Sequence, residues 1–70
     1  MTKEEADQFL KNNLHLENKQ FRRTDGAIVS TSDFQVVTNG NNSFVACKVK
    51  NGDAFYADAL EGFLKTHTLI

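Results

Sequence analysis

The sequence predicts an α+β fold with an N-terminal helix, an antiparallel β-meander of three to five short strands and a short C-terminal helix. Two observations lead to this prediction. Apolar residues recur at helical spacing near both ends of the chain, and Asp-Gly or Asn-Gly pairs separate β-rich runs in the middle. The helices and the meander would form two layers. Five strands would allow the meander to curl into a small open barrel, and the sequence leaves both arrangements open.

The N-terminal helix is expected over residues 3 to 13. Thr2 and Glu5 have the spacing of a capping box, in which each side chain accepts a hydrogen bond from the other residue's backbone N–H. Asn12 and Asn13 have poor helix propensity, which favours an end at that point. An apolar stripe is expected to face the core: Ala6, Phe9, Leu10 and Leu14.

Three turn signals divide the middle of the chain: Asp25-Gly26, Asn39-Gly40 and Asn51-Gly52. Each pairs a residue that tolerates positive φ with a glycine, which favours it. The β-rich runs around them predict strands over 20–24, 27–31, 34–38, 43–50 and 54–57. A short helical turn capped by Ser32 is the alternative to a strand over 32–36. The amide-rich loop over 39–43 is expected to be longer than a minimal hairpin needs.

The C-terminal helix is expected over residues 59 to 66. Asp58 would cap it and Glu61 would occupy its third position, while Gly62 would let it approach the sheet closely. Its buried stripe is predicted to be Leu60, Phe63 and Leu64. After it, Leu69 and Ile70 would lie against the sheet edge.

Composition limits the class of protein. The 70 residues predict one domain over 1–70, and eight basic against nine acidic residues argue against a polybasic nucleic-acid binder. Cys47 is the single cysteine and has no internal disulfide partner, which favours a reducing compartment. The N-terminus is polar, and no apolar run approaches the roughly 18 residues that span a bilayer. We therefore expect a cytoplasmic protein without membrane contact.

The reactive side chains predict no catalytic, metal or cofactor site. The chain contains no phosphate-binding loop, no His-Glu-x-x-His and no Cys-x-x-Cys pattern. Cys47 lies on the apolar phase of a strand between Val45 and Val49, where a thiol serves as a small hydrophobe. His15 and His67 are expected at the ends of the two helices. The sequence therefore predicts a protein that is not an enzyme.

A cluster of cations is the first candidate binding site. Its residues are Lys19, Arg22 and Arg23, extended by Lys48 and Lys50 if the two strands are neighbours. Such a cluster can meet phosphates or an acidic protein surface. Strand alternation would place Arg22 and Arg23 on opposite faces, which weakens the patch. The alternative is that these are solvated charges protecting sheet edges.

Acidic and aromatic residues supply two further candidates. Asp53, Asp58 and Glu61 would form an acidic face if the two helix starts were neighbours, bringing in Glu4, Glu5 and Asp7. Helix capping is the alternative explanation for several of them. Tyr56 and Phe55 point to opposite faces of one strand. An aromatic exposed beside Lys48 or Lys50 would be an anchor for a partner, unless a helix buries it, and Tyr56 is the candidate.

These observations favour a small non-catalytic protein-binding module. A free-standing chain of this size is often encoded by a phage or other mobile element. We therefore expect an inhibitor of a host protein, an expectation that comes from the frequency of such proteins and not from particular residues. The alternative function is a nucleic-acid-binding module using Lys19, Arg22, Arg23, Lys48 and Lys50. A homodimer that pairs exposed strand edges is the third hypothesis.

Overall fold

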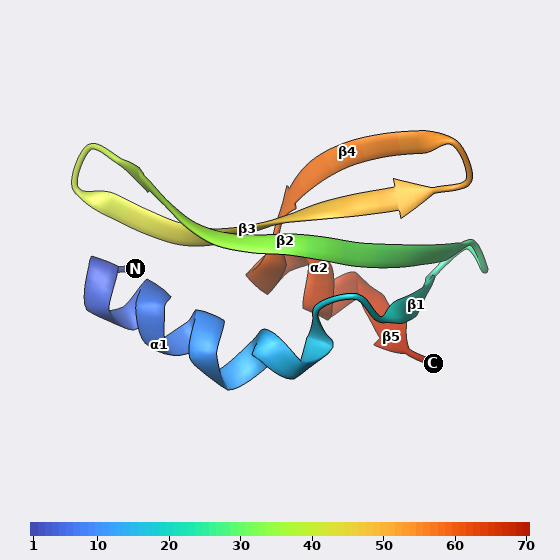
Figure 1. Ribbon diagram of the computed structural model, residues 1–70, viewed down its shortest axis with the longest axis horizontal. Helices are drawn as coiled ribbons and strands as arrows, with labels where there is room; N and C mark the ends of the chain where they lie inside the picture. Colours follow the sequence, from blue (N-terminus) through green and yellow to red (C-terminus); the bar gives the residue numbers. More distant parts are fainter.

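The computed structural model describes all 70 residues, Met1 to Ile70. It confirms the α+β fold with a helix near each end and an antiparallel sheet between them (Figure 1). The elements follow the chain as α1 (Lys3–Asn13), the 3-10 turn η1 (Leu14–Leu16), β1 (Gln20–Arg23), β2 (Ile28–Asn39), β3 (Asn42–Asn51), β4 (Ala54–Ala59), α2 (Leu60–Thr66) and β5 (His67–Leu69).

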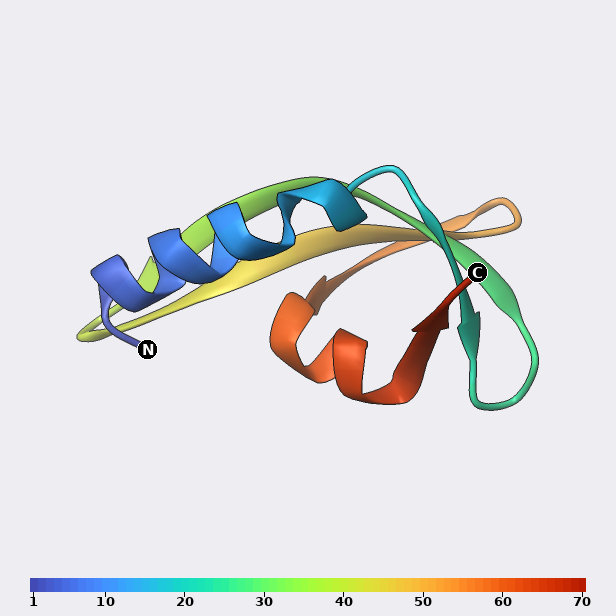
Figure 2. The ribbon, with the colours of Figure 1, turned by 90° about the horizontal axis from the view of Figure 1, so that it is seen from below.

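The sheet has five strands in the order β4-β3-β2-β1-β5. Every neighbouring pair is antiparallel, and the sheet does not close, so β4 and β5 are its two free edges. Both helices lie on one side of the long strands β2 and β3 (Figure 1). The sheet curves around α2, which lies between β4 on one side and the β1–β5 pair on the other (Figure 2).

The five strands are not the five that the sequence predicts. The runs over 27–31 and 34–38 form one long strand, β2, and the helical turn capped by Ser32 is absent. The pairing with β3 shifts between Ser32 and Gln35, and Asp33 in this bulge has a φ of 52°. A bulge absorbs an extra residue without ending the strand, and aspartate tolerates positive φ better than most residues do. The fifth strand is instead β5, formed by the tail.

The N-terminal helix has the predicted bounds and the predicted cap. The Glu5 N–H donates to Thr2 Oγ1 over 3.1 Å, and the Thr2 N–H donates to Glu5 Oε1 over 2.8 Å. Of the expected apolar stripe, Leu14 is wrong, because it lies beyond the helix in η1 and is exposed. The core consists of nine buried residues from both helices and three strands: Ala6, Phe21, Val29, Phe34, Val45, Cys47, Val49, Leu60 and Phe63.

The C-terminal helix begins one residue later than predicted, and Asp58 is not its cap. Asp58 and Ala59 remain in β4, because they pair with Cys47 and Ala46 of β3. The cap position is Ala59, which makes no capping bond through its side chain. Gly62 does not serve a close approach to the sheet: it is exposed, and an added Cβ atom would meet nothing within 4 Å.

The hairpin between β2 and β3 is tighter than predicted. Asn39 pairs with Asn42, so only Gly40 and Asn41 form the turn. One amide of the loop is used by the chain itself, because the N-terminal ammonium donates to Asn42 Oδ1 over 2.8 Å. At the other end of the chain, β5 pairs with β1 as the sheet edge, but Leu69 and Ile70 keep exposed side chains.

Candidate binding surface

Strand alternation divides the sheet into a covered face and an open face. In β3, Val45, Cys47 and Val49 are buried beneath the helices, as the sequence predicts. The residues between them therefore point to the other side, which neither helix covers (Figure 1). We call this side the open face. Its β3 residues are Phe44, Ala46, Lys48 and Lys50.

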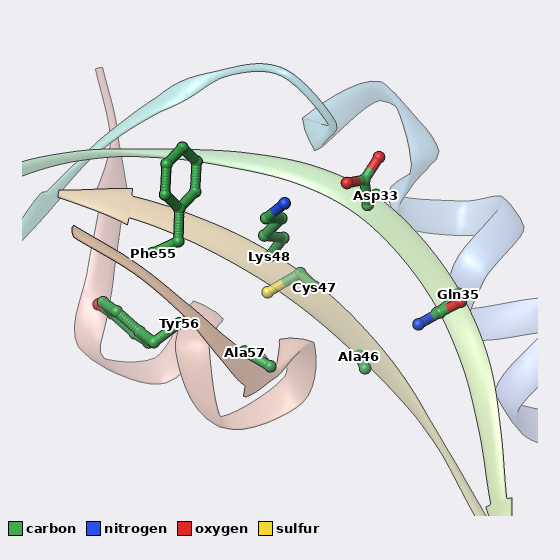
Figure 3. Close-up of a pocket in the computed structure, with 8 residues that line it drawn as sticks. All are labelled: Asp33, Gln35, Ala46, Cys47, Lys48, Phe55, Tyr56 and Ala57. Carbon is green, nitrogen blue, oxygen red and sulfur yellow. The ribbon is translucent and has the colours of Figure 1, made fainter. Parts of the chain in front are cut away.

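Three alanines make the middle of the open face hollow. Ala59 pairs with Ala46, and Ala57 pairs with Lys48, so small side chains from β3 and β4 lie next to one another. The alanines lie at the bottom of two adjoining hollows, which have volumes of about 360 and 450 Å³. Both hollows are lined by Ala46, Ala57 and Gln35 of β2. We call the two hollows together the alanine groove. Figure 3 shows the smaller hollow with its lining residues, which include Asp33, Lys48 and Phe55.

Aromatic side chains stand at both ends of the alanine groove. Phe44 pairs with Val37 of β2 at one end, where both line the larger hollow. At the other end, Phe55 pairs with Lys50 and is 58% exposed. The Lys48 ammonium lies 4.9 Å from the centre of the Phe55 ring, and the Lys50 ammonium lies 5.5 Å from it. These are cation–π distances. The open face therefore combines an apolar floor with an exposed aromatic ring beside two cations.

The structure brings some of the basic candidates together and separates others. Arg22 pairs with Ile28 and lies on the open face with Lys48 and Lys50, but β2 stands between β1 and β3. Lys19 is exposed and precedes β1. Arg23 points to the covered side, as alternation predicts. Only three of the five basic candidates therefore share one face.

Arg23 is engaged by its own turn. Its guanidinium donates to both carboxylate oxygens of Asp25, over 2.9 and 2.8 Å. These bonds, followed by one from the Ala27 N–H, lower the pKa of Asp25 to about 2. Lys48, Lys50 and Arg22 form no ion pair, and the chain has only one other, between Lys3 and Asp7.

The acidic candidates are spread over three elements. Asp53 lies in the turn that precedes β4, Asp58 lies near the other end of that strand, and Glu61 lies in the first turn of α2. A strand rises about 3.3 Å per residue, which puts Asp53 and Asp58 roughly 16 Å apart. Asp58 Oδ1 accepts the Ala59 N–H over 2.8 Å. The structure therefore does not bring these carboxylates into one cluster.

Tyr56 and Phe55 occupy different surroundings on β4. Tyr56 pairs with Val49 and lies on the same side as the helices, yet it remains 38% exposed. Phe55, on the open face, is the one that lies beside Lys48 and Lys50. The ring beside the lysines is therefore Phe55 and not Tyr56, the aromatic that the sequence analysis names as a binding candidate.

The thiol and the imidazoles lie in three separate places. Cys47 is 2% exposed on β3, and burial raises the pKa of its thiol to about 11. His15 is exposed in η1. The His67 ring stacks on Phe63 with centroids 3.8 Å apart, and its Nδ1 lies 2.9 Å from the Phe63 carbonyl oxygen. No three His, Cys, Asp or Glu side chains are grouped as metal ligands.

Sequence reasoning missed the alanine groove. Ala46, Ala57 and Ala59 fall on outward strand positions, and that part of the signal is visible in the alternation. Their adjacency depends on the pairing register of β3 with β4, which the two-residue turn of Gly52 and Asp53 sets; the Asn51-Gly52 signal predicts a turn here but does not by itself give that register.

Comparisons with known proteins give no match. No protein-family model matches this chain, and neither the curated proteins nor the solved structures compared with it resemble it significantly. The longer of the two α-helices has only 11 residues, and no helix is long and apolar enough to cross a bilayer.

Proposed function

We propose that the protein binds another protein through the open face of its sheet, with the alanine groove at the centre of the contact. The supporting observation is the groove itself, an apolar hollow between the exposed Phe55 ring and Phe44 that no element of the chain covers. Protein interfaces take most of their energy from aromatic anchors and well-packed hollows near their centre. Such binding would cover the partner's surface, and we propose inhibition of the partner as its consequence.

The size of the molecule is consistent with use of a whole face. A stable interface buries about 800 Å² on each partner. The chain exposes 4602 Å² in all, so such an interface would cover about one sixth of it. A single hollow is too small for that, whereas a face spanning several strands is suitable. We also propose a cytoplasmic location, because the single cysteine is free.

Two arginine substitutions test the proposal. Ala57→Arg places a long charged side chain on the floor of the groove, whereas Asn12→Arg introduces the same side chain at an exposed position of α1, away from the open face. Tagged wild type and both variants are used for affinity capture from a nuclease-treated lysate, after circular dichroism has shown that all three fold. Wild type and Asn12→Arg should retain the same proteins, and Ala57→Arg should lose them. Equal retention by Ala57→Arg would contradict the proposal.

Nucleic acid is the second candidate partner, because Arg22, Lys48 and Lys50 share the open face with Phe55. The cations would meet phosphates, and the ring would stack on a base. Three phosphate contacts on a single strand predict a slope of about −2.1 for log affinity against log salt. Arg22→Ala should make that slope shallower by about 0.7. Capture that survives nuclease treatment unchanged would count against this second candidate.

A further inference from the structure

The strand β4 is a free edge with little of the usual protection. It ends the sheet and has a neighbour, β3, on one side only. Its sequence, Ala-Phe-Tyr-Ala-Asp-Ala, contains no Lys, Arg or Pro, and its register with β3 has no bulge; its one charged residue, Asp58, lies near its end on the covered side. Natural edge strands are normally blunted by such residues, by bulges or by shortness. The opposite edge, β5, has only three residues and is protected by its length.

The backbone and side chains of β4 are suited to receive one more strand. Alternate N–H and C=O groups of an edge strand point away from its partner and are free to pair. Phe55 and Tyr56 are both exposed, on opposite faces, so side chains of an added strand would meet an aromatic ring on either side. Asp58 Oδ1 already accepts the Ala59 N–H, which leaves the stretch before Asp58 as the open part of the edge.

The charge next to this edge indicates what the added strand carries. On the open face, Lys48 pairs with Ala57 and Lys50 pairs with Phe55, so both lysines lie one strand inside the edge. Neither forms an ion pair. An added strand would lie about 4.8 Å beyond β4, where its open-face side chains approach these long cations across small or flat neighbours. Carboxylates at those positions would supply the missing counter-charges.

We propose that β4 takes up an extended segment of a partner protein whose side chains on the open face are acidic. The segment would add a sixth strand to the sheet, with backbone hydrogen bonds supplying affinity and the alternating carboxylates supplying selectivity. The inference rests on the proposed function, because it names how the partner is held at that same face. The inference goes beyond the proposed function because it states the secondary structure and the charge of the partner's segment.

A second copy of this chain fits the edge less well. Pairing β4 with its own copy about a two-fold axis would place Lys48 and Lys50 of both copies on one continuous face. Asp33, on β2, is the only acidic residue that lines the hollow with Lys48. Four ammoniums would then share one face with only the two Asp33 carboxylates, which leaves a net positive charge that opposes pairing. Charge complementarity therefore favours an acidic partner segment over self-pairing.

The probe for this inference is a nine-residue peptide with alternating Glu and Val and blocked termini, and its matched control carries Lys in place of Glu. Amide shifts and hydrogen exchange of the ¹⁵N-labelled protein are followed during titration. The Glu peptide should shift the β4 amides and slow exchange of those that β3 leaves unpaired, and the Lys peptide should do neither. The double variant Lys48→Gln/Lys50→Gln should bind the Glu peptide up to about tenfold more weakly.

Each alternative result has a distinct meaning. Shifts confined to Val37, Phe44 and Ala46, with β4 exchange unchanged, would overturn strand addition while leaving binding at the face intact. Equal binding of the Lys peptide would overturn the acidic assignment. Slow β4 exchange together with a concentration-dependent dimer, in the absence of peptide, would show that a second copy occupies the edge. A Glu peptide that moves no signal overturns this inference alone, because the Ala57→Arg capture experiment does not involve the peptide.

Discussion

Replacing Glu17 with alanine is expected to destabilise the fold although this residue lies outside every helix and strand. Glu17 follows η1, and its Oε2 accepts the backbone N–H of Phe34 over 2.9 Å. Phe34 is a core residue that directly follows Asp33 in the bulge of β2. A bulge leaves a backbone group without its usual partner in the sheet. The carboxylate of Glu17 satisfies that group from a segment 17 residues away.

The magnitude follows from the type of bond. A hydrogen bond to a charged group contributes about 1.5–3 kcal/mol, and a buried N–H that loses its acceptor costs a similar amount. Glu17→Ala should therefore lower the free energy of unfolding by about 1.5–3 kcal/mol. A chain of this length has roughly 4–10 kcal/mol in total. The segment keeps its other anchors, because the Asn18 N–H donates to the Thr31 carbonyl and the Thr31 N–H to that of Lys19, so the variant should still fold.

The assay is urea unfolding followed by circular dichroism, with Glu17→Gln as the matched control. The glutamine keeps an oxygen acceptor but loses the charge, so it should cost about half as much or less. A slope near 1 kcal/mol per molar urea turns the alanine effect into a midpoint lower by about 1.5–3 M. If Glu17→Ala unfolds within about 0.5 kcal/mol of wild type, the Phe34 N–H does not depend on this carboxylate and the reasoning is wrong.

Three further predictions concern stability. The pKa of Cys47 is about 11 in the fold against an ordinary 9.0, so the unfolded thiol ionises first and the fold should lose up to about 1.4 kcal/mol per pH unit between pH 9 and 11. In Cys47→Ala this loss should be absent when free energies of unfolding from denaturant titrations are compared between pH 9 and 11. The same pH dependence in wild type and Cys47→Ala would refute the prediction. Thr2→Ala removes the capping box and should lower the free energy of unfolding by about 1 kcal/mol, as measured by thermal melting. An unchanged melting temperature would show that the cap does not stabilise the fold. Gly62→Ala should stabilise the protein by about 0.5–1 kcal/mol, because nothing lies within 4 Å of the added methyl, and destabilisation would reveal a clash.

Local signals in the sequence predict much of the fold. The capping box of Thr2 and Glu5 places the first helix correctly, because both of its bonds form within four residues. Gly26, Gly40 and Gly52 all have positive φ at the three predicted turns. The alternation around Cys47 identifies which side of β3 is buried. Each of these features depends on neighbours in the chain.

The features that the sequence leaves open depend on distant residues. The bulge at Asp33 is stabilised by the carboxylate of Glu17, and the late start of α2 follows from pairing of Asp58 with β3. The sheet edge formed by β5 requires β1 as its neighbour. The candidate site depends on a shorter-range feature, the register of the β3–β4 hairpin. Alternation places Lys48 and Lys50 on one face, but only the register between β3 and β4 brings Phe55 against them.

Chemical protection of lysines in the captured complex tests most directly whether the open face is the binding surface. The complex and the free protein are acetylated under the same conditions, and the rate at each lysine is measured by mass spectrometry. Lys11, exposed on α1 away from the open face, is the internal control. Binding at the open face predicts that Lys48 and Lys50 react several-fold more slowly in the complex while Lys11 is unchanged. Protection of Lys11 with Lys48 and Lys50 still fully reactive would contradict it.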